Sequence, residues 1–189
     1  YNIVVNLVGK IQLKNILMAI IAASKSNLDL KKIFSVIPKL SPVEGRFESI
    51  GKIKNKSLVF LDYAHTPDAL QTCLQNIKEQ FPNKNISVLF GCGGNRDKGK
   101  RSKMGKIVDK YADNIYLTDD NPRHEMPKKI RNEIKRGIKK SRIIEISNRK
   151  EAIVKAINNL NTGNVLIVAG KGHEKIQQIG NRKVFLSLF

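Results

Sequence analysis

The chain is poor in the residues that build disulfide frameworks, zinc sites and aromatic binding surfaces. It has two cysteines, no tryptophan, and only 6% aromatic residues in a length of 189. Because Cys73 and Cys92 do not form a Cys-x-x-Cys pair, neither a zinc site nor a disulfide framework is indicated, and a reducing cytoplasm is the simplest compartment. The scarcity of aromatics also speaks against a surface on which nucleic-acid bases stack.

Long apolar runs and acidic residues are scarce as well. The longest apolar run, residues 16–23, is too short to cross a bilayer, and no signal peptide is visible, so no membrane insertion is expected. Sixteen acidic residues face 35 basic ones, which gives a formal net charge of +19. The excess is mostly lysine spread over the whole length, so we interpret it as solvated surface, with help in holding anionic substrates as the alternative.

Regular alternation of strand-like and helix-like segments begins after residue 41. We expect strands at 46–53, 57–62, 86–90, 114–117, 142–146 and 165–169, with helices at 67–80, 102–112, 127–139 and 148–160 between them. Strands separated by helices of this length predict an α/β fold with a mainly parallel sheet and helices on both faces.

Residues 1–41 differ from the rest of the chain. They contain an expected strand at 3–8 and expected helices at 13–24 and 29–37, which are too few elements to close a core. Turn residues at 40–45 break the pattern, and we place a domain boundary there, between 1–41 and 42–189. The chain begins at Tyr1 without a methionine, so we interpret the first part as the helical tail of a preceding domain and the chain as a fragment.

Four polar loops follow expected strands, at 62–65, 91–96, 118–125 and 170–174. The carboxyl ends of parallel strands meet at one edge of a sheet, where open α/β sheets bind ligands. In the third loop, Pro122 stiffens the turn, Arg123 could grip a carboxylate, and the acids could take an ammonium, so the loop could hold a zwitterion. A helix-capping turn is the alternative.

The other three loops also allow two interpretations each. The glycine-rich loop is either an anion site or a tight turn with exposed charges, and it fits neither the phosphate loop nor the dinucleotide fingerprint. Asp62 could hydrogen-bond a ribose and His65 could meet a phosphate or base, or the pair could simply cap and pack the turn. Glu174 could bind an amine, or its loop could be an ordinary connection.

Taken together, the stretches 62–68, 91–101, 120–123 and 170–174 resemble, in order and spacing, the motifs of the Mur ligase family. The resemblance covers essentially the whole chain. It implies that residues 42–189 form the family's C-terminal Rossmann-like domain and that residues 1–41 end its central ATP-binding domain.

The resemblance also implies a reaction. Members of the family use ATP and Mg²⁺ to phosphorylate a substrate carboxylate, and an amine then attacks the acyl phosphate to give an amide. The Asn-Pro-Arg turn favours the branch that adds meso-2,6-diaminopimelate to UDP-N-acetylmuramoyl-L-alanyl-D-glutamate. A lysine-adding ligase, a folylpolyglutamate synthetase, a cyanophycin synthetase, or a basic nucleotide- or nucleic-acid-binding module are the alternatives, although nucleic acid is not the expected partner.

Residue roles follow from the same resemblance. Diaminopimelate is expected to contact Arg96, Asp120, Asn121, Arg123, Gly170 and Glu174, with Arg123 on the distal carboxylate. Bound lysine would leave Arg123 buried without a partner, which discriminates strongly. Nucleotide contacts are expected at Asn15, Arg46, Asp62 and His65.

The sequence departs from the family pattern in what it lacks. It has no phosphate loop, none of the central-domain residues that hold Mg²⁺, and no uridine-binding domain. We therefore expect no catalytic or metal-binding residue in this chain, which we take to be a monomer. We predict that the 189-residue chain alone neither hydrolyses ATP nor ligates a substrate.

Overall fold

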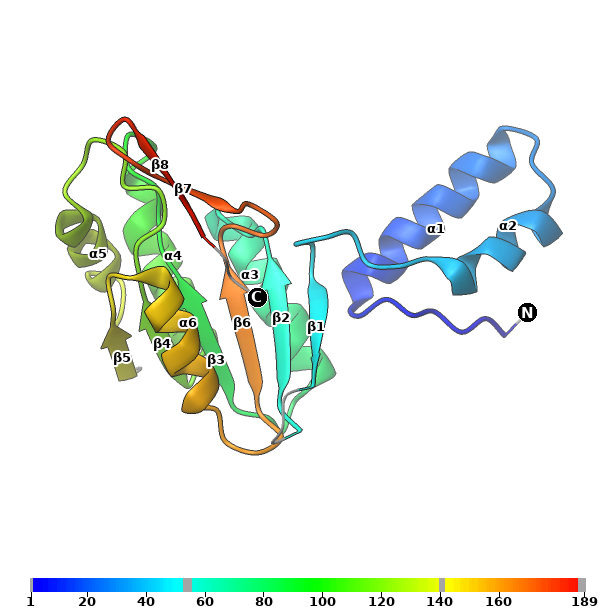
Figure 1. Ribbon diagram of the computed structural model, residues 1–189. Helices are drawn as coiled ribbons and strands as arrows, with labels where there is room; N and C mark the ends of the chain where they lie inside the picture. The colour runs from blue at the N-terminus through cyan, green and yellow to red at the C-terminus, as the bar shows by residue number, and fades with distance from the viewer. Residues whose placement is uncertain (1, 53–55, 140–141, 187–189) are drawn as a thin grey trace. The chain divides into compact units, whose positions relative to one another are not determined.

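Figure 1 shows the computed structural model of the chain, which describes residues 2–52, 56–139 and 142–186. The chain forms two compact units, Tyr1–Val43 and Glu44–Phe189, and each is described by itself. None of the helices in the described residues is long and apolar enough to cross a membrane.

The first unit is helical. It contains α1 (Lys10–Lys25), α2 (Leu30–Val36) and the short 3-10 helix η1 (Ile37–Lys39). Asp29 caps α2, because its carboxylate accepts the backbone N–H of Lys31 at 2.5 Å. The expected strand at 3–8 is wrong, since these residues have no regular structure. A strand needs a neighbour for its backbone groups, and the described part of this unit contains no other strand.

The second unit is built on a six-stranded sheet with the order β1-β2-β6-β3-β4-β5. The edge strand β1 runs antiparallel to β2, and the other neighbours are parallel. The strands are β1 (Glu48–Lys52), β2 (Leu58–Asp62), β3 (Ile86–Phe90), β4 (Asn114–Leu117), β5 (Arg142–Glu145) and β6 (Val165–Ala169).

Helices cover both faces of this sheet. Figure 1 shows α6 in front of the strands, with α3 and α4 behind them. The helices are α3 (Pro67–Gln80), α4 (Gly99–Tyr111), α5 (Pro127–Lys135) and α6 (Arg149–Asn158). The predicted fold class, α/β with a mainly parallel sheet between helices, is confirmed.

The hydrophobic core explains why these runs form central strands. Every residue of β3 and β6 is buried, as expected for parallel strands with both faces covered. Successive side chains point to opposite faces, so Leu166 and Val168 of β6 pack toward Ala152, Ile153 and Ala156 of α6. Val59, Leu61, Leu89 and Tyr116 of the neighbouring strands belong to the same cluster.

The sequence analysis missed one element. A hairpin of β7 (Ile176–Ile179) and β8 (Arg182–Phe185) follows β6, and it pairs antiparallel as a separate two-stranded sheet. Its strands are short and largely exposed, so they lack the apolar pattern that marks the central strands. The hairpin lies at the carboxyl-end side of the parallel strands (Figure 1).

Candidate functional site

The four polar loops meet at one edge of the sheet, as the sequence predicts. They enclose a cavity of about 460 Å³ at the carboxyl ends of β2, β3, β4 and β6. All six predicted diaminopimelate contacts line it, together with His65 from the predicted nucleotide set. The complete lining is Tyr63, His65, Thr66, Pro67, Gly93, Arg96, Asp97, Lys100, Asp120, Asn121, Arg123, Gly170 and Glu174.

The glycine-rich loop packs directly against the Asn-Pro-Arg turn. The N–H of Gly94 donates to the carbonyl of Asn121 at 2.8 Å, and Arg123 Nη1 donates to the carbonyl of Gly94 at 2.8 Å. A Cβ on Gly94 would lie 1.9 Å from the carbonyl oxygen of Pro122, so only glycine permits this approach. The loop glycine is thus explained by contact between two loops, which favours the tight-turn interpretation at this position.

Arg123 is held in an unusual backbone conformation by the hairpin. Its φ is 50°, in the left-handed region that non-glycine residues rarely adopt. The N–H of Arg123 donates to the carbonyl of Gln178 at 3.1 Å, and the N–H of Gly180 donates to the carbonyl of Arg123 at 2.6 Å. Such conformations persist where the surroundings over-determine them, and here β7 supplies that constraint.

A buried arginine, Arg101, holds the loop that contains this turn. Arg101 is fully buried in α4, and its Nη1 donates to Glu125 at 2.9 Å and to Glu133 at 2.6 Å. Its Nη2 also donates to the carbonyl of Gly93 at 3.0 Å. The hydrogen bond from Arg101 lowers the pKa of Glu125 to about 2. The guanidinium of Arg101 therefore links α4 to α5, and it links the glycine-rich loop to the loop that contains the Asn-Pro-Arg turn.

A buried lysine contacts three residues of the cavity lining. Lys171 is fully buried, and its Nζ donates to Asn121 Oδ1 at 2.9 Å, to the carbonyl of Ile176 at 2.8 Å and to Glu174 Oε2 at 3.3 Å. Asp120 Oδ1 lies 3.3 Å from the same Nζ. Sequence reasoning missed Lys171, because nothing in the pattern separates it from the many surface lysines.

The cavity therefore carries opposite charges on different loops. Arg96 and Arg123 supply guanidinium groups from the glycine-rich loop and the Asn-Pro-Arg turn. Asp120 and Glu174 supply carboxylates. A site of this kind suits a ligand that has both carboxylate and ammonium groups.

Asp119 does not belong to this site, although it neighbours Asp120 in the sequence. Its carboxylate is paired with Arg131 of α5, which also donates to Glu145 at 2.7 Å. Burial raises the pKa of Asp119. The pairing ties the end of β4 to α5 and to β5, so its role is structural.

The predicted nucleotide residues are more scattered. Both carboxylate oxygens of Asp62 accept backbone N–H groups, one from Phe47 at 2.7 Å and one from Ala64 at 2.8 Å, and burial raises the pKa of Asp62. This geometry favours the turn-capping interpretation of Asp62. Asn15 lies on α1 in the first unit, so its nucleotide role stays a prediction.

An aromatic cluster lies next to the cavity wall. The guanidinium of Arg46 lies 4.4 Å from the ring centre of Tyr63, and the His65 ring meets the same tyrosine edge-on at 4.7 Å. The Tyr63 hydroxyl donates to Glu174 Oε1 at 3.2 Å, and the charge of Glu174 raises the pKa of Tyr63. Tyr63 therefore connects two predicted nucleotide residues with a predicted amino-acid contact.

Neither a metal centre nor a reactive thiol is found among the described residues. No group of three or more His, Cys, Asp or Glu side chains in this part of the chain could hold a metal ion. Cys92 lies in the glycine-rich loop, but burial raises the pKa of its thiol to about 12, so a thiolate does not form at neutral pH.

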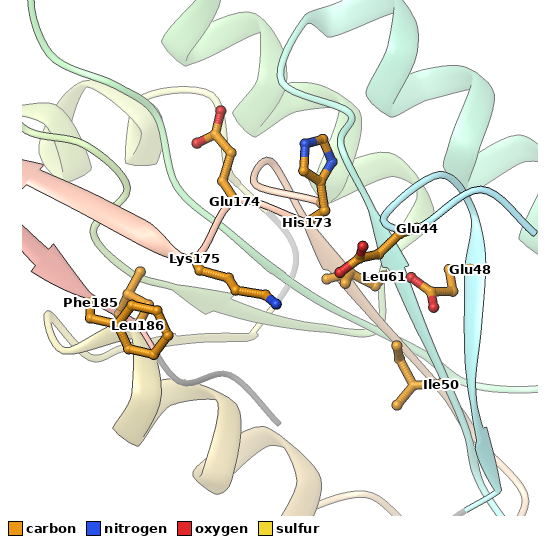
Figure 2. Close-up of a pocket in the computed structure, with 10 residues that line it drawn as sticks. Glu44, Glu48, Ile50, Leu61, His173, Glu174, Lys175, Phe185 and Leu186 are labelled. Atoms are coloured by element: carbon orange, nitrogen blue, oxygen red, sulfur yellow. The ribbon is translucent and has the colours of Figure 1, made fainter.

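A second cavity, of about 320 Å³, lies beside β1 and is shown in Figure 2. Glu174 and Lys175 extend in different directions from the loop in that view. Glu48 already accepts the backbone N–H of Gly45 at 2.7 Å. Of the predicted amino-acid contacts, only Glu174 also borders this cavity, so it is not the predicted site.

Comparison with known proteins assigns the family. Residues 45–172 match the family described as "Mur ligase, glutamate ligase domain". The match covers more than half of the chain, so the chain belongs to the Mur ligase family, as the motifs predict.

Two relatives show which branch of the family the chain resembles. A protein of Rickettsia felis, named UDP-N-acetylmuramoyl-L-alanyl-D-glutamate--2,6-diaminopimelate ligase, is 47% identical over 180 residues, which are 95% of this chain and 33% of the relative. A protein of the same name from Rhizobium meliloti is 45% identical over 96% of this chain and 37% of its own length. The chain thus spans about a third of the length of these relatives.

Solved structures agree with this assignment. A structure with the same ligase name matches with a TM-score of 0.75 and 36% identity, over 99% of this chain and 38% of that one. Folylpolyglutamate synthase from Thermotoga maritima matches with a TM-score of 0.68 and 22% identity, over 89% of this chain and 38% of that one. At that level of identity the second likeness shows the fold alone.

Proposed function

We propose that this chain supplies the amino-acid-binding domain of an ATP-dependent ligase that adds meso-2,6-diaminopimelate to UDP-N-acetylmuramoyl-L-alanyl-D-glutamate in the cytoplasm. The second unit is the amino-acid-binding domain in this proposal. The first unit is the end of the central ATP-binding domain, with the boundary near residue 42.

One observation carries the proposal. The six residues expected to contact diaminopimelate come from three separate loops, and all of them line a single cavity. The cavity presents guanidinium groups and carboxylates to the same space, and diaminopimelate carries two carboxylates and two ammonium groups. The names of the relatives support the same substrate.

Arg123 is the residue that we assign to specificity. Its Nη1 is engaged with the carbonyl of Gly94, which holds the planar guanidinium in place and leaves its other donors for a carboxylate. Lysine lacks the distal carboxylate, so a bound lysine would leave this cation without its partner.

In the proposed reaction, ATP phosphorylates the substrate carboxylate and so activates it as an acyl phosphate. We propose that the residues that hold Mg²⁺ lie in the parts of the ligase that this chain does not contain, as the resemblance to the family implies. Arg46 and His65 lie around Tyr63 next to the cavity, and we propose that they contact the nucleotide. What the chain itself does is bind the amino acid and orient its amine for attack.

The proposal is tested by measuring binding of meso-diaminopimelate to the 189-residue chain with titration calorimetry. Arg123→Ala should weaken binding by at least about 30-fold, because it removes the half-buried guanidinium that we assign to the distal carboxylate and leaves that carboxylate without a partner. Arg123→Lys should also fail, since a point charge does not reproduce the fork.

Arg136→Ala removes an exposed arginine at the end of α5 and serves as the matched control. Equal affinity of the parent chain for lysine and diaminopimelate would contradict the assigned substrate. The alternative of a basic nucleic-acid-binding module predicts salt-dependent DNA binding that survives loss of both Arg96 and Arg123.

A further inference from the structure

We propose that Lys171 is a positioning residue that fixes the orientation of Asn121 and Glu174, and thereby decides which ligand groups these two side chains can bind. The inference rests on the proposed function and deepens it, because it concerns how the same cavity recognises the amino acid.

The amide of Asn121 is fixed by two donors. Its Oδ1 accepts from Lys171 Nζ at 2.9 Å and from the backbone N–H of Gln178 at 2.9 Å. Two donors converge on one atom of the amide, so that atom is the oxygen, and the Nδ2 group is directed elsewhere. Asn121 lines the cavity, and because its Oδ1 is engaged, the amide group left for a ligand is the Nδ2 donor, which suits a carboxylate and not an ammonium.

Glu174 is fixed in the same way. Its Oε2 accepts from Lys171 Nζ at 3.3 Å, and its Oε1 accepts from the Tyr63 hydroxyl at 3.2 Å. A carboxylate held at both oxygens has little rotational freedom left, so its remaining lone pairs face a defined part of the cavity. These lone pairs of Glu174 suit an ammonium group of the ligand.

Asp120 completes the arrangement. The three protons of Lys171 are taken by Asn121, Glu174 and the carbonyl of Ile176. Asp120 Oδ1 therefore lies 3.3 Å from Nζ as an ion pair, yet this buried oxygen has no hydrogen-bond partner among the described residues. A buried acceptor without a hydrogen bond is costly, so Asp120 depends on the charge of Lys171 to remain ionised in this position.

Lys171 is thus unlike an ordinary structural cation. Three of its four partners line the cavity, and the lysine itself does not. Removing its charge would take away the ion-pair partner of Asp120 and Glu174 and one of the two donors that hold the amide of Asn121. Both changes affect ligand recognition directly.

The test uses the 189-residue chain, with meso-diaminopimelate binding measured by calorimetry and thermal unfolding measured alongside. Lys171→Met should remain folded and bind at least about 30-fold more weakly than the parent. Lys129→Met, at an exposed position on α5, is the matched control and should bind like the parent.

A second variant keeps the inference testable if Lys171→Met does not fold. Asn121→Asp retains an oxygen for Lys171 and Gln178 but replaces the donor at Nδ2 with an acceptor. It should fold and still bind at least about tenfold more weakly, because a hydrogen bond from the amide to a ligand carboxylate is replaced by repulsion between two carboxylates.

A spectroscopic reading separates positioning from simple stability. In the parent chain, the side-chain amide resonances of Asn121 should shift when diaminopimelate binds, and in Lys171→Met that shift should be lost. Folded variants that bind within about twofold of the parent would overturn the inference while the proposed function stands. A parent chain that does not bind at all would overturn the proposed function first.

Discussion

Arg101 and Lys171, two of the three fully buried cations in the described residues, both contact loops of the candidate site, and their partners differ. Arg101 is paired with Glu125 and Glu133, neither of which lines the cavity, and its one bond to a lining residue goes to the backbone carbonyl of Gly93. Lys171 contacts Asp120, Asn121 and Glu174, and all of those line it. Both cationic side chains are buried. The side-chain partners of Arg101 connect parts of the fold, whereas the side-chain partners of Lys171 are residues that line the cavity.

The difference teaches how to interpret a buried charge. Buried ion pairs contribute little net stability, but removing one partner leaves an uncompensated charge and is strongly destabilising. Where the partners contact only other parts of the protein, removing the buried charge lowers the free energy of unfolding. Where the partners face a ligand, we expect a large part of the effect in binding.

The largest effect that this comparison predicts is on stability, for Arg101→Met. It leaves Glu125 and Glu133 without their cation, so unfolding should be easier by about 3–5 kcal/mol. Urea denaturation measures this directly, with Lys103→Met on the exposed side of the same helix as the control. A loss under about 1 kcal/mol would mean that the guanidinium is not the link between the two loops.

A smaller effect, on ligand binding, is expected for Tyr63→Phe. It tests whether Glu174 needs a second donor besides Lys171. The variant removes only the hydroxyl that donates to Glu174 Oε1 and keeps the ring beside Arg46 and His65. Loss of one hydrogen bond to a charged group should weaken diaminopimelate binding by roughly tenfold, with unfolding little changed. Calorimetry that finds unchanged affinity would show that Lys171 alone suffices to hold Glu174.

A third effect is on the pH dependence of stability, and it concerns Glu125. Its folded-state pKa of about 2 lies below the ordinary value of 4.5, so its contribution to stability is present above about 4.5 and is lost as the pH falls toward 2. Glu125→Gln should therefore flatten the fall in unfolding free energy over that range. Urea titrations at several pH values check this, and parallel curves for parent and variant would contradict it.

Much of the second unit could be predicted from the residues. The central strands are short apolar runs bounded by turn residues, and β3, β4 and β6 were predicted with the bounds that the structure has. Helix ends were predicted less well: α5 ends at Lys135, before Gly137, whereas the predicted helix continued to 139. The strand at 3–8 was wrong, because β-branched residues favour a strand only where a partner strand exists.

The candidate site divides in the same way. Motifs at the ends of strands marked Arg96, Asp120, Asn121, Arg123, Gly170 and Glu174, and the parallel sheet required them to share one edge. Lys171 and the β7–β8 hairpin were missed. Their importance comes from contacts with residues about 50 positions away in the chain, and no local pattern records such contacts.

The sequence by itself determined the alternation of strands and helices, the family, and which loops carry polar side chains, because these depend on local periodicity and motif spacing. Only the tertiary structure decided which polar atoms are free to meet a ligand. Asn121 keeps its oxygen for Lys171 and Gln178, and Asp119 is taken by Arg131. The physical reason is that a hydrogen-bonding atom is available only after its neighbours in space, distant in the chain, have been satisfied.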